Sequence, residues 1–222
     1  MQDLSQYIDH TILKADATLE NIKKLCNEAK EYNFFSVCIN SSFIKDAKKY
    51  LKNTNVKVCT VVGFPLGANN SNTKAFEAKT AIEDGADEID MVVNIGLLKS
   101  KEYDRVKEDI EIVFAACNGT LLKVIFETAL LSKEEIKIVS LLCKEIGVDY
   151  IKTSTGFSSS GANIEVIKLM KKCVGSKVKI KASGGIRDYK TALAMIEAGA
   201  SRLGVSSSVA IVNGQKSSSK GY

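Results

Sequence analysis

The chain has 222 residues, of which 45% are hydrophobic, and its formal net charge at pH 7 is +5. This apolar content suffices for one sizeable core. Because no apolar run reaches transmembrane length and no basic block is interleaved with aromatic residues, we expect neither membrane association nor nucleic-acid binding. Six widely spaced cysteines without a C-x-x-C pair, and a single histidine, are typical of a reduced, cytoplasmic protein and argue against a disulfide scaffold or a metal site.

Short apolar runs alternate with amphipathic stretches along the whole chain. The runs predict strands over residues 7–11, 34–39, 56–62, 88–94, 121–127, 149–153, 177–183 and 201–206. Between them, apolar residues recur at helical spacing, and one such stretch begins with the capping-box pair Ser132 and Glu135. Eight strand–helix units predict a single-domain (β/α)8 barrel, the TIM-barrel fold, with a short N-terminal segment. We expect one domain over residues 1–222, with a flexible tail at 213–222.

A weak internal repeat predicts which side chains share one layer inside the barrel. The repeat occurs at residues 31–38, 83–90, 145–152 and 197–204. In each copy a helix ends, a glycine (an asparagine in the first copy) takes the left-handed capping position, and a strand begins two residues later. The fifth residue after the capping position is Cys38, Asp90, Lys152 or Gly204. Since alternate strands supply one interior layer, we expect these four residues at one level.

Lys152 ends the predicted strand in "VDYIKTSTGF" (148–157). Most strand-end lysines reach solvent, but this one falls on an interior position. Burial and a second positive charge both lower the pKa of a lysine, and a partly neutral lysine can form a Schiff base with a carbonyl. Lys181, at the end of the next strand, can supply that charge, whereas Lys179 lies a layer deeper and receives no role.

The remaining candidates are a carboxylate and two groups of small residues. Asp90 is suited to carry protons, to form an ion pair with a lysine, or to do both. "ASGGI" (182–186) and "RLGVSSS" (202–208) follow the last two strands, where barrels usually bind phosphate, and "TSTG" (153–156) lies on the same rim. A lysine, a carboxylate and a phosphate site are what a metal-free aldolase needs.

Five fragments closely resemble the deoxyribose-phosphate aldolase family. In chain order they are "EIDMVVNIG", "LLKVIFETALL", "YIKTSTGF", "KIKASGGIR" and "RLGVSSS", and the likeness extends from "IDHTILKADAT" to the terminal tyrosine. The resemblance implies a (β/α)8 barrel and a class I aldolase without metal or cofactor. The implied reaction is the reversible cleavage of 2-deoxy-D-ribose 5-phosphate to D-glyceraldehyde 3-phosphate and acetaldehyde, in deoxyribonucleotide catabolism. A cytoplasmic homodimer is also implied.

The same resemblance implies roles for individual residues. Lys152 forms the Schiff base, Lys181 favours its neutral form, and Asp90 relays protons, assisted by Tyr222 at the end of the flexible tail. The implied phosphate ligands are Thr155, Gly156, Gly184, Gly185, Gly204, Ser206 and Ser207. The implied residues of the sugar pocket are Asp9, Thr11 and Cys38. Some relatives carry a lysine where this chain has Phe157, so any help which that lysine gives to phosphate binding is missing.

Two other functions stay open at this point. Another Schiff-base-forming barrel aldolase would use the same lysine with a different donor, although acetaldehyde needs no room for a hydroxymethyl group. A non-catalytic phosphosugar-binding protein would use the rim loops for binding and Lys152 only as an electrostatic contact. His10 and Thr11 end the first strand and are candidates for shaping the substrate pocket, although a lone histidine is more often a structural hydrogen-bonding residue.

Overall fold

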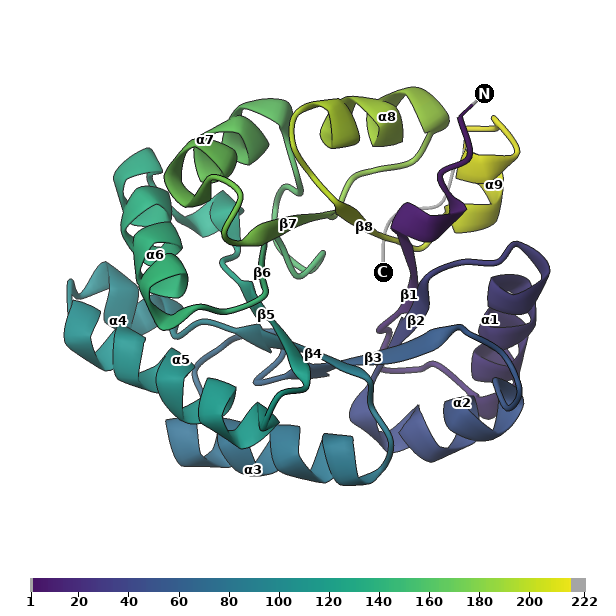
Figure 1. The fold of residues 1–222 in the computed structure, drawn as a ribbon, viewed down its shortest axis with the longest axis horizontal. Coiled ribbons are helices and arrows are strands. Elements are labelled where there is room, and N and C mark those ends of the chain that lie inside the picture. The colour runs from purple at the N-terminus through teal and green to yellow at the C-terminus, as the bar shows by residue number, and fades with distance from the viewer. Residues whose placement is uncertain (1, 217–222) are drawn as a thin grey trace.

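The predicted strand segments form a closed parallel barrel in the computed structural model, which describes residues 2–216 (Figure 1). Each strand pairs in parallel with the next, and the last pairs with the first. The strands are β1 (Ile8–Ile12), β2 (Ser36–Ile39), β3 (Lys57–Val62), β4 (Glu88–Val92), β5 (Leu121–Ile125), β6 (Tyr150–Lys152), β7 (Lys179–Ser183) and β8 (Arg202–Val205). All lie within the predicted ranges except β1, which ends one residue later. The TIM-barrel prediction is therefore confirmed.

Amphipathic helices connect the strands and surround the barrel (Figure 1). They are α1 (Leu19–Glu31), α2 (Ile44–Tyr50), α3 (Ser71–Glu83), α4 (Ile95–Lys99), α5 (Tyr103–Cys117), α6 (Lys133–Ile146), α7 (Ile164–Val174), α8 (Tyr189–Glu197) and α9 (Ser208–Val212). The predicted capping box opens α6, since the Glu135 N–H donates to Ser132 Oγ at 3.2 Å and the Ser132 N–H donates to Glu135 Oε2 at 2.7 Å. Within residues 2–216, none of the helices is both long enough and apolar enough to cross a membrane.

The internal repeat sets the depth of four side chains in the barrel. Each capping position has a φ angle in the left-handed region: 51° at Asn33, 110° at Gly85, 86° at Gly147 and 120° at Gly199. The strands that follow begin three residues after these positions, rather than the predicted two. The third residue of each strand is then Cys38, Asp90, Lys152 or Gly204. The repeat therefore brings these residues to equivalent places in their strands.

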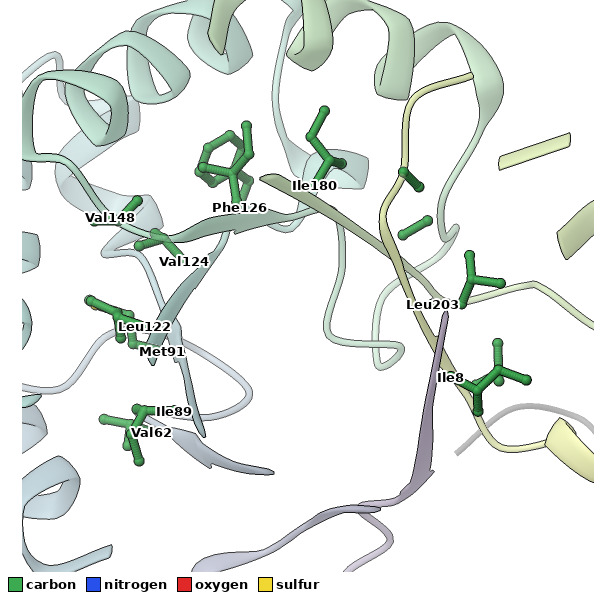
Figure 2. Packing of buried hydrophobic residues seen from close by; sticks show 14 of the residues in the cluster. Ile8, Val62, Ile89, Met91, Leu122, Val124, Phe126, Val148, Ile180 and Leu203 are labelled. Carbon is green, nitrogen blue, oxygen red and sulfur yellow. The ribbon is translucent and has the colours of Figure 1, made fainter. Parts of the chain in front are cut away.

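Apolar side chains pack mainly between the sheet and the helices. On β4, Ile89 and Met91 point outward into this layer, as Leu122 and Val124 do on β5 (Figure 2). A second, smaller apolar cluster consists of Leu13, Cys38, Cys59 and Val61, with Phe64 packed against it. Because side chains alternate along a strand, Asp90, which lies between Ile89 and Met91, points to the opposite side, into the barrel. The sheet thus separates an apolar outer layer from an interior that contains charged groups.

The predicted flexible tail begins with residues that return to α9. The Gly214 N–H donates to the Ile211 carbonyl at 3.1 Å, and the Gln215 N–H donates to the Ala210 carbonyl at 2.8 Å. Tyr222 lies outside the described residues, so its predicted role in proton transfer stays a prediction.

Candidate active site

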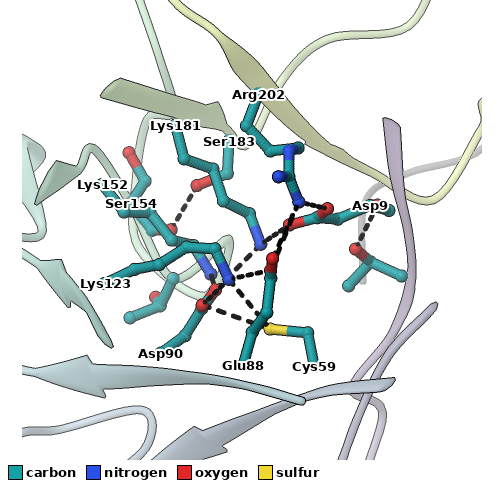
Figure 3. Close-up of polar contacts among 12 residues, drawn as sticks. Asp9, Cys59, Glu88, Asp90, Lys123, Lys152, Ser154, Lys181, Ser183 and Arg202 are labelled. Carbon is teal, nitrogen blue, oxygen red and sulfur yellow. Dashed lines mark hydrogen bonds and ion pairs between the residues drawn. The ribbon is translucent and has the colours of Figure 1, made fainter. Parts of the chain in front are cut away.

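Within residues 2–216, seven buried charged side chains are joined by ion pairs inside the barrel, and we call them the charge cluster (Figure 3). They are Asp9, Glu88, Asp90, Lys123, Lys152, Lys181 and Arg202, and each is at most 4% exposed. Four cations face three carboxylates, so the cluster has one positive charge in excess when all seven groups are ionised. Interiors of such barrels are usually filled by branched apolar side chains. A charged interior is costly to bury and indicates a functional site.

Asp90 is the centre of the charge cluster and brings both predicted lysines together. Its Oδ2 atom lies 2.8 Å from Lys152 Nζ and 2.8 Å from Lys181 Nζ. Its Oδ1 atom lies 2.7 Å from Lys123 Nζ and accepts a hydrogen bond from Cys59 Sγ at 3.2 Å. Lys152 and Lys181 are also directly paired residues of β6 and β7. The predicted layer that joins Asp90 to Lys152 is therefore present.

Lys152 has fewer carboxylate partners than the other cations of the charge cluster. Lys123 contacts Glu88 at 2.6 Å as well as Asp90. Lys181 contacts both Asp9 and Asp90, and Arg202 contacts Asp9 at 2.8 Å and Glu88 at 3.2 Å. Among the described residues, the only carboxylate in ion-pair distance of Lys152 is Asp90. Removing a proton from Lys152 thus breaks the fewest ion pairs.

The contacts also set which groups of the charge cluster stay ionised. Burial by itself raises the pKa of Asp90, but three ammonium groups outweigh it and hold that pKa well below its ordinary value. Burial lowers the pKa of Lys181, whereas Asp9 and Asp90 raise it, and the result is a pKa well above the ordinary value. The pKa of Lys123 is raised in the same way, against burial, chiefly by Asp90. These groups stay ionised at neutral pH, and the excess charge is relieved when Lys152 is neutral.

Gly204→Ala is expected to displace Lys181 from the charge cluster. A methyl group at position 204 would lie 2.9 Å from Lys181 Cε and 3.0 Å from Ser183 Cβ, which is closer than the ~3.5 Å of a normal carbon–carbon contact. Since Lys181 is fully buried between two carboxylates, it cannot turn aside without losing one of them. We expect kcat to fall about tenfold to a hundredfold, the size of loss that a misplaced catalytic group causes.

Steady-state kinetics and urea unfolding measure this effect, with Gly96→Ala as the matched control. A methyl group at Gly96 would have its nearest neighbour, Asn94 Oδ1, at 3.5 Å. Alanine is favoured over glycine within a helix by about 1 kcal/mol, so this control should be active and at least as stable as the parent chain. Full activity in Gly204→Ala would contradict the tight fit of Lys181.

The predicted phosphate loops line a cavity of about 190 Å³ at the carboxyl ends of the last strands. Its lining includes the predicted Gly156, Gly184, Gly185, Gly204, Ser206 and Ser207. Gly184 and Gly185 have φ angles of 82° and 78°, which side-chain-bearing residues rarely adopt, and such glycine turns expose backbone N–H groups to an anion. The cavity is also lined by Arg187, whose positive charge suits a phosphate.

Two residues of the "TSTGF" segment lie differently from the phosphate loops. Thr155 is buried and outside the lining of the 190 Å³ cavity, and its hydroxyl donates to Glu127 Oε2. The Phe157 ring is 47% exposed and packs edge-on against Phe64, with 5.4 Å between the ring centroids. The rim therefore carries an aromatic pair at this position.

The residues predicted for the sugar pocket lie on the adjacent strands β1 and β2, where Thr11 pairs with Cys38, but their side chains have different surroundings. Asp9 belongs to the charge cluster, and Cys38 is fully buried in the small apolar cluster beside Cys59. The Thr11 hydroxyl donates to the Asp9 carbonyl at 2.8 Å. Thr11 also lines a different cavity, of about 390 Å³, which shares Ser206 with the phosphate loops.

His10 is held at both ring nitrogens. Its Nδ1 atom lies 2.8 Å from Ser208 Oγ, and its Nε2 atom lies 2.8 Å from Glu28 Oε2. These contacts tie β1 to α1 and to the first residue of α9. His10 is therefore a structural hydrogen-bonding residue, as the simpler interpretation of a lone histidine predicts.

The sequence analysis missed Glu88, Lys123 and Arg202. Each had a usable signal, because Glu88 precedes Asp90 by two residues, Arg202 precedes Gly204 by two, and Lys123 interrupts the apolar run "LLKVIFE". Two-residue alternation from a known interior position places Glu88 and Arg202 inside the barrel. These two residues therefore belong to the interior layer next to that of Asp90 and Gly204.

In the part of the chain that the structure describes, two groups of side chains have the donor atoms for a metal ion. They are Cys38, Cys59 and Asp90, and Asp9, Cys59 and Glu88, with donor atoms within 4.8 Å of one another. Their carboxylates, however, already bind ammonium or guanidinium groups. A divalent cation would add charge to a cluster that has an excess of positive charge, so these residues suit an amine better than a metal.

A closed (β/α)8 barrel that buries an incompletely paired lysine beside a glycine-lined cavity has the architecture of a Schiff-base-forming aldolase. Residues 4–214 match the model of the DeoC/LacD family aldolases. The chain belongs to this family.

Individual relatives agree with the family match. A curated deoxyribose-phosphate aldolase of Histophilus somni (strain 2336) is 60% identical over 212 residues, which cover 96% of this chain and 95% of that protein. A solved structure of an aldolase named QR15 is 42% identical, with a TM-score of 0.92 and coverage of 96% of both chains. The structure of deoxyribose phosphate aldolase from Aeropyrum pernix, described as a unique tetramer, is 30% identical, has a TM-score of 0.85, and covers 95% of this chain and 89% of its own.

Proposed function

We propose that this protein is a class I aldolase that reversibly cleaves 2-deoxy-D-ribose 5-phosphate to D-glyceraldehyde 3-phosphate and acetaldehyde, in deoxyribonucleotide catabolism. The observation that carries the proposal is Lys152, a buried amine with one carboxylate partner in a cluster that has excess positive charge. The substrate follows from the curated relatives, which are named for it, and from the glycine-lined cavity on the same rim.

The reaction begins with an imine between Lys152 and the open-chain sugar. The neutral Lys152 Nζ attacks C1, a new carbon–nitrogen bond forms, and the carbonyl oxygen leaves as water. The imine nitrogen then takes up one proton from solvent and becomes an iminium, which draws electrons from the adjacent carbon. Lys181 and Lys123 stay protonated throughout, so they oppose the return of a proton to the free amine.

Carbon–carbon cleavage follows between C2 and C3. The electron pair of this bond must reach the iminium, which is possible only if an enamine forms across C1 and C2. The C3 hydroxyl loses its proton as glyceraldehyde 3-phosphate leaves. Because Asp90 has a low pKa, it passes this proton on rather than keeping it. The enamine is then protonated at C2, and water releases acetaldehyde and Lys152.

The phosphate group is bound by the loops after β6, β7 and β8. The proposed ligands are Gly156, Gly184, Gly185, Gly204, Ser206 and Ser207, with Arg187 as an added cation. Thr155, a predicted ligand, is buried against Glu127 and supports this rim. We propose that Asp9 helps to hold Lys181, and that Cys38 forms part of the apolar wall near the reacting carbons.

We also propose that the enzyme is a cytoplasmic homodimer whose residues 1–222 form one folding unit. The wide spacing of the cysteines supports a reduced compartment, and the family resemblance supports the dimer. The relative from Aeropyrum pernix is described as a tetramer. Sedimentation equilibrium of the purified protein measures the assembly directly.

Borohydride reduction in the presence of acetaldehyde tests the function and the nucleophile together. Reduction of the imine is expected to leave one ethyl group on Lys152, located by peptide mass mapping, and no adduct should form in Lys152→Ala. Lys179→Ala is the matched control, because Lys179 lies on the adjacent strand with its amine 5.7 Å from the centre of the Tyr150 ring. Turnover with an unmodified Lys152 would refute its role, and binding without turnover would favour a phosphosugar-binding protein.

A further inference from the structure

Glu127 is a buried carboxylate that the proposed mechanism leaves unused. It is 3% exposed and lies two residues beyond β5, at the carboxyl ends of the strands, where such barrels build their active sites. Its Oε2 atom accepts hydrogen bonds from the Thr155 hydroxyl and from the Thr155 N–H, the latter at 3.3 Å. Its Oε1 atom is buried without a hydrogen-bond partner among the described residues.

The backbone of Glu127 is also unfavourable. Its φ and ψ angles are 57° and 64°, in the left-handed region that residues other than glycine and asparagine seldom occupy. A strained backbone and an unsatisfied buried oxygen therefore coincide at one residue. Buried polar atoms are nearly always hydrogen-bonded in folded proteins, and exceptions call for an explanation. A ligand that donates a hydrogen bond would satisfy Oε1.

Glu127 lies against the segment that connects Lys152 to the phosphate cavity. The Phe126 N–H donates to the Lys152 carbonyl at 3.0 Å, and the Thr128 N–H donates to the Thr153 carbonyl at 2.9 Å, so Glu127 is held against the end of β6. Burial raises the pKa of Glu127, whereas the Thr155 contacts and the Lys152 charge oppose this shift. This segment begins at Lys152, which binds C1 in the proposed reaction. It continues through Thr155 to Gly156, which lines the phosphate cavity.

The geometry points to Glu127 as a specificity-determining residue, whose free oxygen accepts a hydrogen bond from the C4 hydroxyl of the sugar phosphate. This inference rests on the proposed function. Of the two free hydroxyls between C1 and the phosphate, the C3 hydroxyl gives up its proton in the cleavage. The C4 hydroxyl keeps its proton and is adjacent to the phosphorylated carbon. In the synthetic direction it is the 2-hydroxyl of D-glyceraldehyde 3-phosphate.

Two acceptor aldehydes that differ in this hydroxyl test the inference. With acetaldehyde as donor, kcat/KM is measured for D-glyceraldehyde 3-phosphate and for 3-oxopropyl phosphate, which lacks the hydroxyl. The parent enzyme should prefer the hydroxylated acceptor by about tenfold or more. Glu127→Gln should lower that preference by about tenfold, because the amide NH2 group takes the place of Oε1 and cannot accept a hydrogen bond from the hydroxyl. The glutamine carbonyl can still accept from Thr155, so the turn is retained.

Controls separate this result from a general loss of function. Glu135→Gln, the same change in the capping box of α6, should leave the acceptor preference unchanged. Borohydride trapping of acetaldehyde on Lys152 should persist in Glu127→Gln, since acetaldehyde has no hydroxyl. Equal losses for both acceptors in Glu127→Gln would overturn the inference, as would a parent enzyme that uses both acceptors equally well. A parent enzyme that traps no acetaldehyde would instead refute the proposed function.

Discussion

Asp90→Asn is expected both to slow cleavage strongly and to destabilise the fold. Its carboxylate lies within 2.8 Å of three buried ammonium groups. An amide leaves Lys152 without a carboxylate partner and leaves Lys123 and Lys181 with one each. Breaking a buried ion pair by removing one partner costs about 3–5 kcal/mol. Because the proton relay is lost too, we expect kcat to fall by about 10²–10⁴, the usual contribution of a positioned acid–base group. Urea unfolding and steady-state kinetics measure the two effects.

A second substitution separates the structural effect of Asp90 from its catalytic effect. Lys123 contacts Asp90 through Oδ1, the carboxylate oxygen that Lys152 and Lys181 do not use. Adding Lys123→Met to Asp90→Asn returns the charge cluster to its original net excess of one positive charge. The free energy of unfolding should therefore be partly recovered. Activity should stay low in the double variant, because the relay is still missing. Recovery of activity together with stability would show that Asp90 acts only as a structural counter-ion.

The trapping experiment gives Asp90→Asn a third readout. The variant should still form a reducible imine with acetaldehyde, since Lys152 remains in place and has lost the partner that favours its ammonium form. Cleavage of the sugar phosphate should be slow in the same protein. If Asp90→Asn forms no imine although it is folded, then Asp90 is required for the nucleophile itself, and the division of roles proposed for Lys152 and Asp90 is wrong.

Lys181→Met is expected to move the working pH range of the enzyme upward. The pKa of Lys181 lies well above its ordinary value, so it is a permanent cation beside Lys152 at neutral pH. Its removal takes away a like charge from Lys152 and leaves Asp90 with one cation fewer. Both changes favour the ammonium form of Lys152, which cannot attack a carbonyl. At pH 7 we expect kcat/KM to fall by about 10²-fold or more, with partial recovery as the pH rises.

A pH–rate profile between neutral and alkaline pH measures this shift. The direction of the shift decides the outcome. Without the neighbouring cation, the free amine is formed only at higher pH, so the acid limb of the profile must move to the alkaline side. Lys179→Met, two residues earlier on the same strand, is the control and should keep the parent profile. A Lys181→Met variant with reduced activity and an unshifted profile would mean that Lys181 positions Asp90 or substrate without affecting the nucleophile.

The order of the elements and the interior position of Lys152 could be predicted from local sequence. Apolar runs, the capping box of α6 and the left-handed residues Asn33, Gly85, Gly147 and Gly199 depend on neighbours within a few positions. These signals placed the ends of the strands within two residues and brought Asp90 and Lys152 to equivalent positions. Local physics decides such features because hydrogen bonds within a turn and alternation along a strand do not depend on distant parts of the chain.

The charge balance of the site was decided only by the tertiary structure. Arg202 and Asp9 come from opposite ends of the chain and meet because barrel closure pairs β8 with β1. The number of carboxylates around each cation, which singles out Lys152, is a property of that closed arrangement. The unsatisfied oxygen of Glu127 is likewise invisible in the sequence, since burial and missing partners are defined only after distant strands pack together. The sequence by itself determined which charged groups are available and how deep in the barrel they lie. Three-dimensional packing determined which of these groups form ion pairs with one another.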